Sequence, residues 1–368
     1  MKRSVKWLCA ALVAALLCGC TLRSAPTTTA PKAEEEADLN LAISDTYDLQ
    51  AMGCQLTKLT GEAVTASGNV LTAVAEGTAQ VTVTCDDQER TLQVRVFANA
   101  QELGGRFSVD KGMFHGKNVI VFGDSITDGY LLDPMKPRNY DDTYFAKLCE
   151  YLGAATDPTD RINCNLALGG TQISSGNSFS GISGAERMER VEPFYEDGTK
   201  RDIRPAILTA DLCVIYYGTN DLVGGKLAQA TGSGWVTDTP RKASDAQTIR
   251  GALYFMINML RSLNPDIKIL VLPPVLRRAD GELLIYSEGK TDVINKSTGQ
   301  SILQYRDVMK EVCQENGAKF VDWSPVFTYE NFCADEATTY SADGLHPNAA
   351  GHQLMFDYLL SLLTQEEQ

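Results

Sequence analysis

A serine, a histidine and an aspartate in this chain have the types and the surroundings that acyl transfer requires. Ser125 lies two residues after Gly123, and Gly123 ends the apolar run 119–122. Such a run, rich in β-branched residues, predicts a buried parallel strand, and open α/β sheets bind their ligands beyond the carboxyl ends of strands. Ser125 could then act as a nucleophile if a base and an oxyanion site reach it. The alternative is that Gly123-Asp124-Ser125 is only a turn with a helix cap.

The base must come from one of three histidines. His115 precedes the predicted strand and is expected at its opposite end, and His352 falls inside the last predicted helix, where a solvated or core-edge histidine is common. His346 stands in a loop, three residues after Asp343. Asp343 can hold the imidazole tautomer while Nε2 takes the Ser125 proton. We therefore predict that Ser125, Asp343 and His346 are catalytic.

Three donors are candidates for the oxyanion hole: the backbone N–H groups of Ser125 and Gly170 and the side-chain amide of Asn220. Glycine suits the second position because a side chain there would block close approach. Taken singly, a Gly-Gly pair indicates a turn and an Asn after Thr indicates a cap. Their common placement after predicted strands favours the oxyanion interpretation. Asp124 is expected to accept a hydrogen bond within its turn, and Asp221 to cap or brace its own loop.

From about residue 105 onward, apolar runs alternate with segments of helical spacing, which predicts an α/β fold: a mainly parallel sheet between helices. The strands are expected at 119–122, 162–168, 212–217, 267–272 and 320–323. Helices are expected at 144–152, 246–263, 302–314 and 349–363, with Asn264-Pro265 ending the second and Gly317 just beyond the third.

Four blocks in this region resemble those of the SGNH, or GDSL, hydrolases. They are Gly123-Asp124-Ser125-Ile126-Thr127, Asn165 with Gly170 five residues later, Gly218-Thr219-Asn220-Asp221, and Asp343 with His346-Pro347. The resemblance spans roughly 117–365, and Ala167, where many members have Gly, departs from it outside the chemistry. It implies a flavodoxin-like three-layer α/β/α sandwich and a serine esterase that works through an acyl-serine intermediate. It implies no metal and no cofactor.

The N-terminus is expected to be a targeting segment. Lys2, Arg3 and Lys6 precede the apolar run 7–17, which is short for a membrane span. The following Leu17-Cys18-Gly19-Cys20 resembles a bacterial lipobox, so residues 1–20 are predicted to be a lipoprotein-type signal peptide that anchors the exported protein to the bacterial cell membrane through Cys20. The alternative is an ordinary secretory signal with a chance cysteine. Residues 21–37, rich in Thr, Pro, Ala and Glu, are predicted to be a disordered linker.

Residues 38–99 differ from the region that follows. Short alternating segments separated by Gly, Asn and Asp predict a small β-sandwich, with strands within 46–50, 70–74, 80–84 and 91–96. The run 69–83 resembles the bacterial Ig-like domain of group 2, which serves as a spacer or an adhesive module; a stalk is favoured over a ligand site. Cys54 and Cys85 form a candidate disulfide here. The hydrolase domain is then expected at 105–368.

The charge balance of 33 basic and 47 acidic residues, a net charge of −14, argues against a nucleic-acid partner. The expected substrate is a small-molecule or polysaccharide ester, and the leading hypothesis is O-deacetylation of a carbohydrate. Loops at 224–242, with Trp235, and 277–296, with Tyr286, are expected to shape the site. One alternative is a lysophospholipase or thioesterase acting on lipids. Another, from a different class, is a surface protein that binds glycans without cleaving them.

Overall fold

The computed structural model describes residues 37, 39–85, 88–103, 111–133, 136–176, 181–190, 202–224, 239–334 and 338–364. The predicted signal peptide with Cys20, almost all of the predicted linker, and Trp235 lie outside these residues. Within the described part of the chain, no helix is both long enough and apolar enough to cross a membrane.

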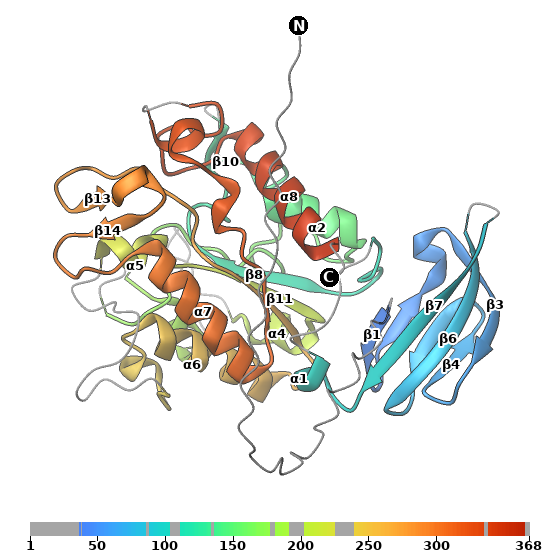
Figure 1. The fold of residues 1–368 in the computed structure, drawn as a ribbon. Helices are drawn as coiled ribbons and strands as arrows, with labels where there is room; N and C mark the ends of the chain where they lie inside the picture. Colours follow the sequence, from blue (N-terminus) through green and yellow to red (C-terminus); the bar gives the residue numbers. More distant parts are fainter. Residues whose placement is uncertain are drawn as a thin grey trace, which may run out of the picture. The chain divides into compact units, whose positions relative to one another are not determined.

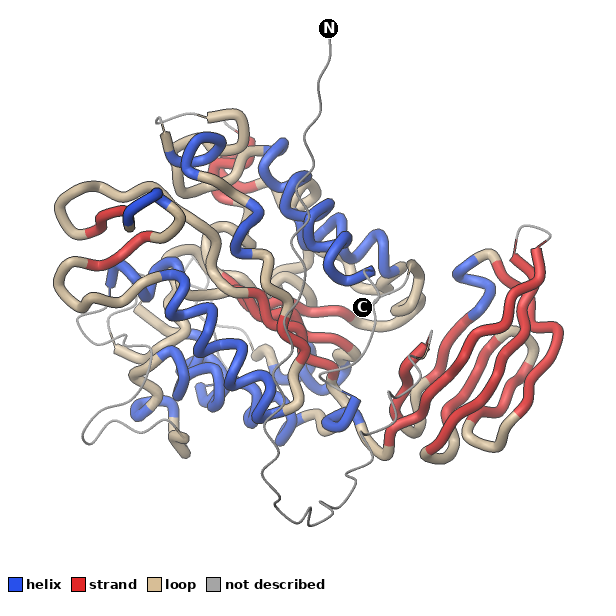
Figure 2. Tube along the Cα trace, viewed as in Figure 1, coloured by secondary structure: helices blue, strands red, loops and turns tan. Residues whose placement is uncertain are grey.

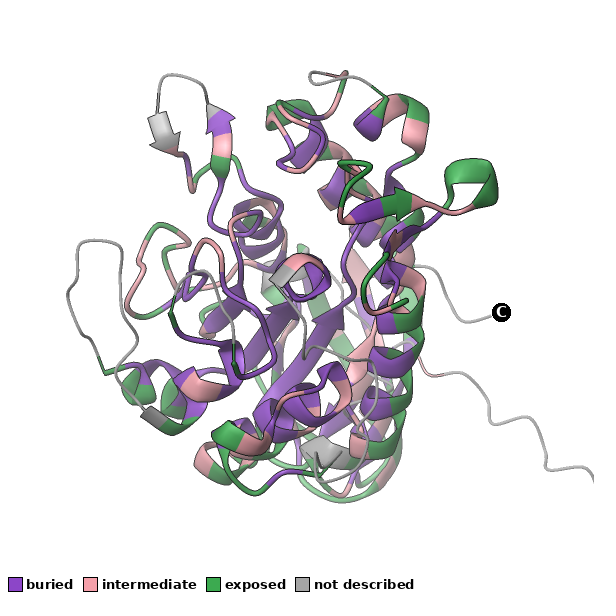
Figure 3. Ribbon diagram, turned by 90° about the vertical axis from the view of Figure 1, so that its left-hand side faces the viewer, coloured by how far each residue is buried: buried purple, intermediate pink, exposed green. Residues whose placement is uncertain are grey.

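The C-terminal region, from residue 111 onward, is built on a parallel sheet in the order β15-β12-β11-β8. Every residue of the three longer strands is buried, because helices cover both faces of the sheet (Figure 3). The strands are β8 (Val119–Gly123), β11 (Leu212–Tyr216), β12 (Lys268–Leu272) and β15 (Lys319–Phe320). The predicted α/β fold with a mainly parallel sheet is confirmed.

The expected strand at 162–168 is not formed as a regular strand, although the segment lies beside β8. It makes one parallel bridge, between Val121 and Asn165. The Asp160 carboxylate captures the N–H groups of Ile162 and Asn163, and the Asn165 side chain captures the N–H of Ala167. These local bonds compete with a ladder. Counted with this segment, the order along the sheet is 2-1-3-4-5, the flavodoxin-like order, whose switch point lies between β8 and β11.

Long helices lie on both faces of the sheet, as the three-layer expectation requires. Helices α2 (Tyr144–Leu152) and α8 (Ala349–Thr364) cover one face, and α6 (Ile249–Leu263) and α7 (Ile302–Asn316) cover the other (Figures 1 and 2). The shorter helices are α1 (Ala100–Leu103), α3 (Gly184–Arg190), α4 (Arg204–Thr209) and α5 (Thr219–Gly224).

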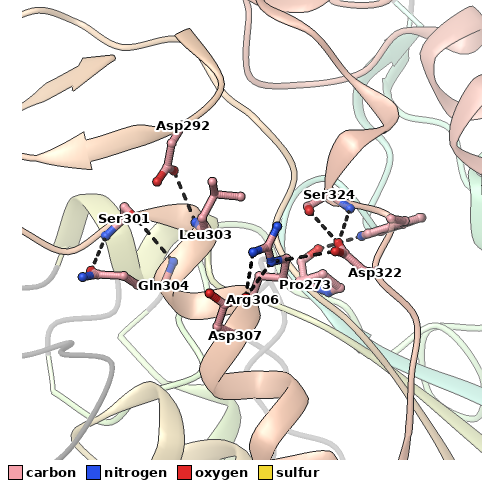
Figure 4. Close-up of polar contacts among 10 residues, drawn as sticks. Pro273, Asp292, Ser301, Leu303, Gln304, Arg306, Asp307, Asp322 and Ser324 are labelled. Carbon is pink, nitrogen blue, oxygen red and sulfur yellow. Dashed lines mark hydrogen bonds and ion pairs between the residues drawn. The ribbon is translucent and has the colours of Figure 1, made fainter. Parts of the chain in front are cut away.

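Capping residues fix where these helices begin and end. Helix α6 begins three residues later than predicted because the Thr248 side chain accepts the N–H of Gly251 and acts as its N-cap. Ser301 and Gln304 form a capping box at the start of α7, where Asp292 also accepts the N–H of Leu303 (Figure 4). Gly317 ends α7 with a φ of 61°, as expected of a C-cap glycine.

The last strand is shorter than the predicted 320–323. It stops at Phe320 because the Asp322 carboxylate accepts both the N–H and the hydroxyl of Ser324, which turns the chain into a 3₁₀ helix at Ser324–Val326 (Figure 4). Trp323 is buried there, and its Nε1–H donates to the Pro273 carbonyl over 2.6 Å. This bond ties the turn to the carboxyl end of β12.

Residues 39–97 form an all-β region of two sheets, one in the order β1-β7-β6-β3 and one in the order β2-β5-β4. Cys54 and Cys85 lie opposite one another in β3 and β6 and form the expected disulfide. The Ig-like assignment stays a prediction. The strands are β1 (Leu39–Ala42), β2 (Thr46–Asp48), β3 (Cys54–Thr60), β4 (Val64–Ser67), β5 (Val70–Ala73), β6 (Gly77–Cys85) and β7 (Gln88–Phe97).

Candidate active site

The structure brings Ser125, His346 and Asp343 into one hydrogen-bonded chain. Ser125 Oγ lies 2.9 Å from His346 Nε2, and His346 Nδ1 lies 2.8 Å from Asp343 Oδ2. The histidine is buried, while the serine is half-buried. An imidazole held between a hydroxyl and a carboxylate can take a proton from the first and be stabilised in its charged form by the second.

The loop that carries Asp343 and His346 is held by hydrogen bonds between its own residues. Asp343 Oδ1 accepts the backbone N–H groups of Leu345 and His346, at 2.9 and 2.7 Å. Although partial burial acts to raise the pKa of Asp343, the hydrogen bonds and the charge of His346 lower it to about 2. Asp343 therefore stays ionised across the ordinary pH range, with its geometry fixed by three hydrogen bonds.

The nucleophile turn is the tight segment from Gly123 to Gly129. Asp124 Oδ1 accepts the N–H of Ile126 at 3.0 Å, which is the turn-stabilising role expected of it. A Cβ on Gly123 would lie 2.5 Å from Thr127 Oγ1, so the end of β8 needs glycine here. Asp124 is fully buried, and its Oδ2 has no hydrogen-bond partner among the described residues. Burial raises the pKa of Asp124 to about 7.

The three predicted oxyanion donors follow segments that end at the same edge of the sheet. Gly123 pairs with Tyr216 in the β8–β11 register, and the Gly123 carbonyl accepts the N–H of Leu168. Ser125 and Gly170 each lie two residues beyond these aligned positions, and Gly170 has a φ of 75°, the left-handed region that favours glycine.

Side-chain bonds join the loop of Gly170 to the start of α5. Asn220 Nδ2 donates to the Thr171 carbonyl at 3.1 Å, and Gln172 Nε2 donates to the Asn220 carbonyl at 3.0 Å. Asp221 accepts the N–H groups of Ile173 and Ser174 and the hydroxyl of Ser174, so the loop that these bonds brace is the one after Gly170. Gly170 and Asn220 thus belong to one connected unit beside the nucleophile turn, and their role as oxyanion donors stays a prediction.

The other two histidines stand apart from this chain of residues. His115 is exposed and precedes β8. The expectation that His352 is solvated or at the core edge is wrong: it is fully buried, because α8 packs against α2. Its Nδ1 accepts the N–H of Tyr144 at 3.2 Å, and burial lowers the pKa of His352 to about 3.

Arg277 is a site residue whose role the sequence analysis missed. Its Nη1 donates to the Thr219 carbonyl at 3.1 Å, directly before Asn220, and the next backbone N–H, of Arg278, donates to the Gly344 carbonyl at 2.7 Å. Burial lowers the pKa of Arg277, against the opposing charges of Asp124, Asp280 and Asp343. The signal that could have found it is its place just past the apolar end of β12.

Tyr130 is the second residue that was missed. It begins the hairpin of β9 (Tyr130–Asp133) and β10 (Lys136–Arg138), directly after the nucleophile turn. Its ring centroid lies 4.9 Å from that of His346, at an interplanar angle of 72°. An aromatic residue five positions after the nucleophile was the available signal. Asp128, in the same turn, is buried and pairs with Arg138 and Arg161.

The second predicted specificity loop forms a hairpin of β13 (Leu284–Tyr286) and β14 (Val293–Asn295). The ring of Tyr286 packs edge-to-face against Tyr329 at 5.0 Å, and its hydroxyl accepts the N–H of Ala279. These contacts hold the hairpin in shape. Among the described residues, no group of three or more His, Cys, Asp or Glu side chains is placed to hold a metal ion.

Comparison with known proteins identifies the family. The model of the GDSL-like Lipase/Acylhydrolase family matches residues 121–354, which is more than half of the chain. No curated protein matches the chain. Similar solved structures include a Lactobacillus plantarum protein (20% identity, TM-score 0.47, 68% of this chain and 97% of that one covered). Others are a catalytic mutant of an acetylxylan esterase from Geobacillus stearothermophilus (17%, 0.41, 69% and 97%) and an active-site mutant of a family two carbohydrate esterase from Clostridium thermocellum (16%, 0.42, 86% and 88%). With Ser125 and His346 both inside the matched range, the chain belongs to the GDSL-like lipase/acylhydrolase family and is a carboxylic ester hydrolase.

Proposed function

We propose that this ester hydrolase uses Ser125 as its nucleophile, His346 as its general base and acid, and Asp343 as the group that orients the imidazole. The observation that carries this proposal is the 2.9 Å contact between Ser125 Oγ and His346 Nε2. As Oγ attacks the ester carbonyl, its proton passes to Nε2. The N–H groups of Ser125 and Gly170 and the amide of Asn220 stabilise the oxyanion that forms.

The tetrahedral intermediate then collapses and releases the alcohol. His346 Nε2 returns its proton to the leaving oxygen, which leaves the acyl group on Ser125. A water molecule attacks this acyl-serine, gives a proton to Nε2, and the second collapse returns that proton to Ser125 Oγ and frees the acid. The imidazolium forms in both halves, and the ionised Asp343 stabilises it each time.

We propose that the substrate is an acetylated carbohydrate. Of the triad of Ser125, His346 and Asp343, the aspartate has a side chain that is 38% exposed to solvent. Among the described residues with large exposed apolar side chains, Tyr130 is the one in contact with the triad. The others belong to the all-β region, to α4 and to β13: Ile43, Val70, Val74, Leu208 and Ile285. A partly exposed carboxylate and one aromatic ring, both in contact with His346, support a polar alcohol; a lysophospholipase or thioesterase would be favoured by an apolar channel.

Export and a lipid anchor at Cys20 are part of the same proposal. The charged start of the chain, the apolar run and the lipobox-like Leu17-Cys18-Gly19-Cys20 support it, and so does the all-β region, which suits a spacer between a membrane and a catalytic domain. Mass spectrometry of the protein from the membrane fraction tests it. The expected result is an N-terminal peptide that begins at Cys20 and carries the mass of the lipid; an unmodified Cys20 in soluble protein would contradict it.

The decisive experiment measures hydrolysis of p-nitrophenyl acetate, butyrate and octanoate and of acetylated xylo-oligosaccharides by the wild type and by Ser125→Ala and His346→Ala. We expect acetate to be the fastest acyl group and each substitution to lower kcat by about 10⁴-fold. The matched control is His115→Ala, which removes an exposed histidine outside the site and should leave kcat within about twofold.

Other outcomes would point to the alternatives. Octanoate as the fastest ester, with no release of acetate from sugars, would favour a lipid esterase. A wild type that cleaves none of these esters, or a Ser125→Ala variant as active as the wild type, would contradict the catalytic assignment and favour a protein that binds glycans without cleaving them.

A further inference from the structure

The base of a serine esterase marks the side of the site on which the alcohol leaves. In the proposed mechanism His346 Nε2 gives its proton to the leaving oxygen, so that oxygen must come within hydrogen-bond reach of the imidazole. The acyl group stays on Ser125. A side chain packed against the imidazole is therefore positioned to contact the alcohol portion of the ester.

Tyr130 occupies this place. Its ring centroid lies 4.9 Å from that of His346, and the residue is 37% exposed despite this contact. The Tyr130 N–H donates to the Ser125 carbonyl at 3.0 Å, so the tyrosine is attached to the nucleophile's own turn. Part of the tyrosine packs on the base, and part is open to an incoming molecule.

The orientation of the Tyr130 ring is fixed by its neighbours. The Arg138 guanidinium lies over the Tyr130 ring, 5.8 Å from its centroid, and also pairs with the buried Asp128 at 2.5 Å. Gly129, with a φ of 70°, holds the turn into β9, where a Cβ would lie 2.7 Å from the Asn139 carbonyl oxygen. A ring held in this way loses little conformational entropy when a ligand packs on it.

We propose that Tyr130 is the platform of a leaving-alcohol subsite that takes a pyranose ring. A pyranose has a face of C–H groups that packs on an aromatic ring and an edge of hydroxyl groups that stays in water. The half-exposed Tyr130 and the partly exposed Asp343 carboxylate, which both contact His346, match these two parts. The flexible glycerol of a lipid lacks such a face. This inference rests on the proposed function, since it concerns the alcohol released by that same site.

The test separates the alcohol from the acyl group. Wild type, Tyr130→Ala and Tyr130→Phe are compared on acetylated xylo-oligosaccharides and on ethyl acetate, which has the same acyl group but no ring in its alcohol. We expect Tyr130→Ala to lower kcat/KM for the sugar ester about tenfold, within the range measured for losing an aromatic contact. Its kcat/KM for ethyl acetate should fall by a clearly smaller factor, since only the packing on His346 is lost there, and Tyr130→Phe should retain both activities because it keeps the ring.

The matched control is Leu208→Ala, which removes a 55% exposed apolar side chain from α4, at the other end of the sheet, and should change neither substrate. Equal losses on both esters would mean that Tyr130 only holds His346, and would overturn the subsite. Full sugar activity in Tyr130→Ala would overturn the subsite and leave the proposed function standing. A wild type that cleaves ethyl acetate but no acetylated sugar would overturn both.

Discussion

At the scale of single residues, Asp343 has a role that its neighbours define. It accepts two backbone N–H groups and the ring N–H of His346. In Asp343→Asn, the amide keeps the shape but can turn an NH₂ group toward Nδ1, which favours the wrong imidazole tautomer. We expect kcat to fall by about 10⁴-fold with an unchanged circular dichroism spectrum. A variant with more than a tenth of the wild-type kcat would contradict the role assigned to Asp343.

The raised pKa of the buried Asp124 carboxyl predicts that the free energy of unfolding depends on pH. Burial raises its pKa from 3.8 to about 7 in the folded protein. Between these values the folded state keeps a proton that the unfolded state releases, so the free energy of unfolding falls as pH rises, by at most about 1.4 kcal/mol per pH unit. In Asp124→Asn this contribution disappears. Thermal unfolding of both proteins from pH 5 to 8 checks this: the Tm of the wild type should fall relative to that of the variant, and parallel curves would contradict it.

The sequence predicted which residues meet, but not how each is surrounded. His346 could be picked because the chain has only three histidines, and Ser125 and Asp343 because each stands in a recognisable pattern. The burial of His352 depends on how α8 packs against α2, and helical spacing alone does not reveal this. The clustering of Arg277 with Asp124 and Asp343 joins three loops, and no local pattern encodes it.

At the scale of elements, long and well-capped segments were predictable and short ones were not. Helix α2 has the predicted bounds, and α6, α7 and α8 differ from theirs by a few residues, because periodicity over many residues outweighs local effects. The expected strands at 162–168 and 320–323 are both disturbed by an aspartate, but in different ways. Asp160 captures the N–H groups of Ile162 and Asn163 within the first segment. Asp322 binds the N–H and the hydroxyl of Ser324, just beyond the second, and turns the chain there.

The contacts of Arg277 predict that its side chain helps to position two segments of the site, the start of α5 and the loop of Asp343 and His346. It donates to the Thr219 carbonyl, and its neighbour Arg278 holds Gly344 of the loop that carries Asp343 and His346. In Arg277→Met, the start of α5 loses this bond, and the buried Asp124 and the partly exposed Asp343 lose a nearby positive charge. We expect kcat to fall ten- to a hundred-fold while KM changes little, because misplaced catalytic groups cost about that much.

Comparing kcat and Tm of the Arg277 variants distinguishes an arginine that positions catalytic groups from one that only stabilises the fold. Arg277→Lys keeps the charge but cannot reproduce the guanidinium geometry, so it should recover only part of kcat. An Arg277→Met variant with a lowered Tm but the kcat of the wild type would mean that the arginine is structural only.

At the scale of the whole molecule, the disulfide belongs to the all-β region and the triad to the α/β region. Cys54 and Cys85 are separated by 31 residues. A disulfide that closes a loop of this length stabilises the folded state by about 3–4 kcal/mol, because it restricts the unfolded chain. The Cys54→Ala/Cys85→Ala variant should lower the free energy of unfolding of the all-β region by this amount, which is measured as a lower denaturant midpoint. It should leave kcat/KM for p-nitrophenyl acetate within about twofold.

Limited proteolysis and ester hydrolysis, measured on the same samples, check this prediction. Faster cleavage within residues 39–97 with unchanged hydrolysis is the expected result. The other five cysteines that the structure describes are free and buried, so mild reduction of the wild type should reproduce the effect of the double substitution. A parallel loss of hydrolysis would mean that the α/β region depends on this disulfide.

Ser125 and His346, the proposed nucleophile and base, are separated by 221 positions in the sequence. A ribosome that has translated as far as Leu345 has made Ser125, Gly170, Asn220 and Asp343 but has not yet added His346. Until that histidine is added and its loop folds onto the nucleophile turn, the growing polypeptide has a serine without a base. With the roles proposed for Ser125 and His346, the order of the residues along the chain therefore delays esterase activity until His346 has been added.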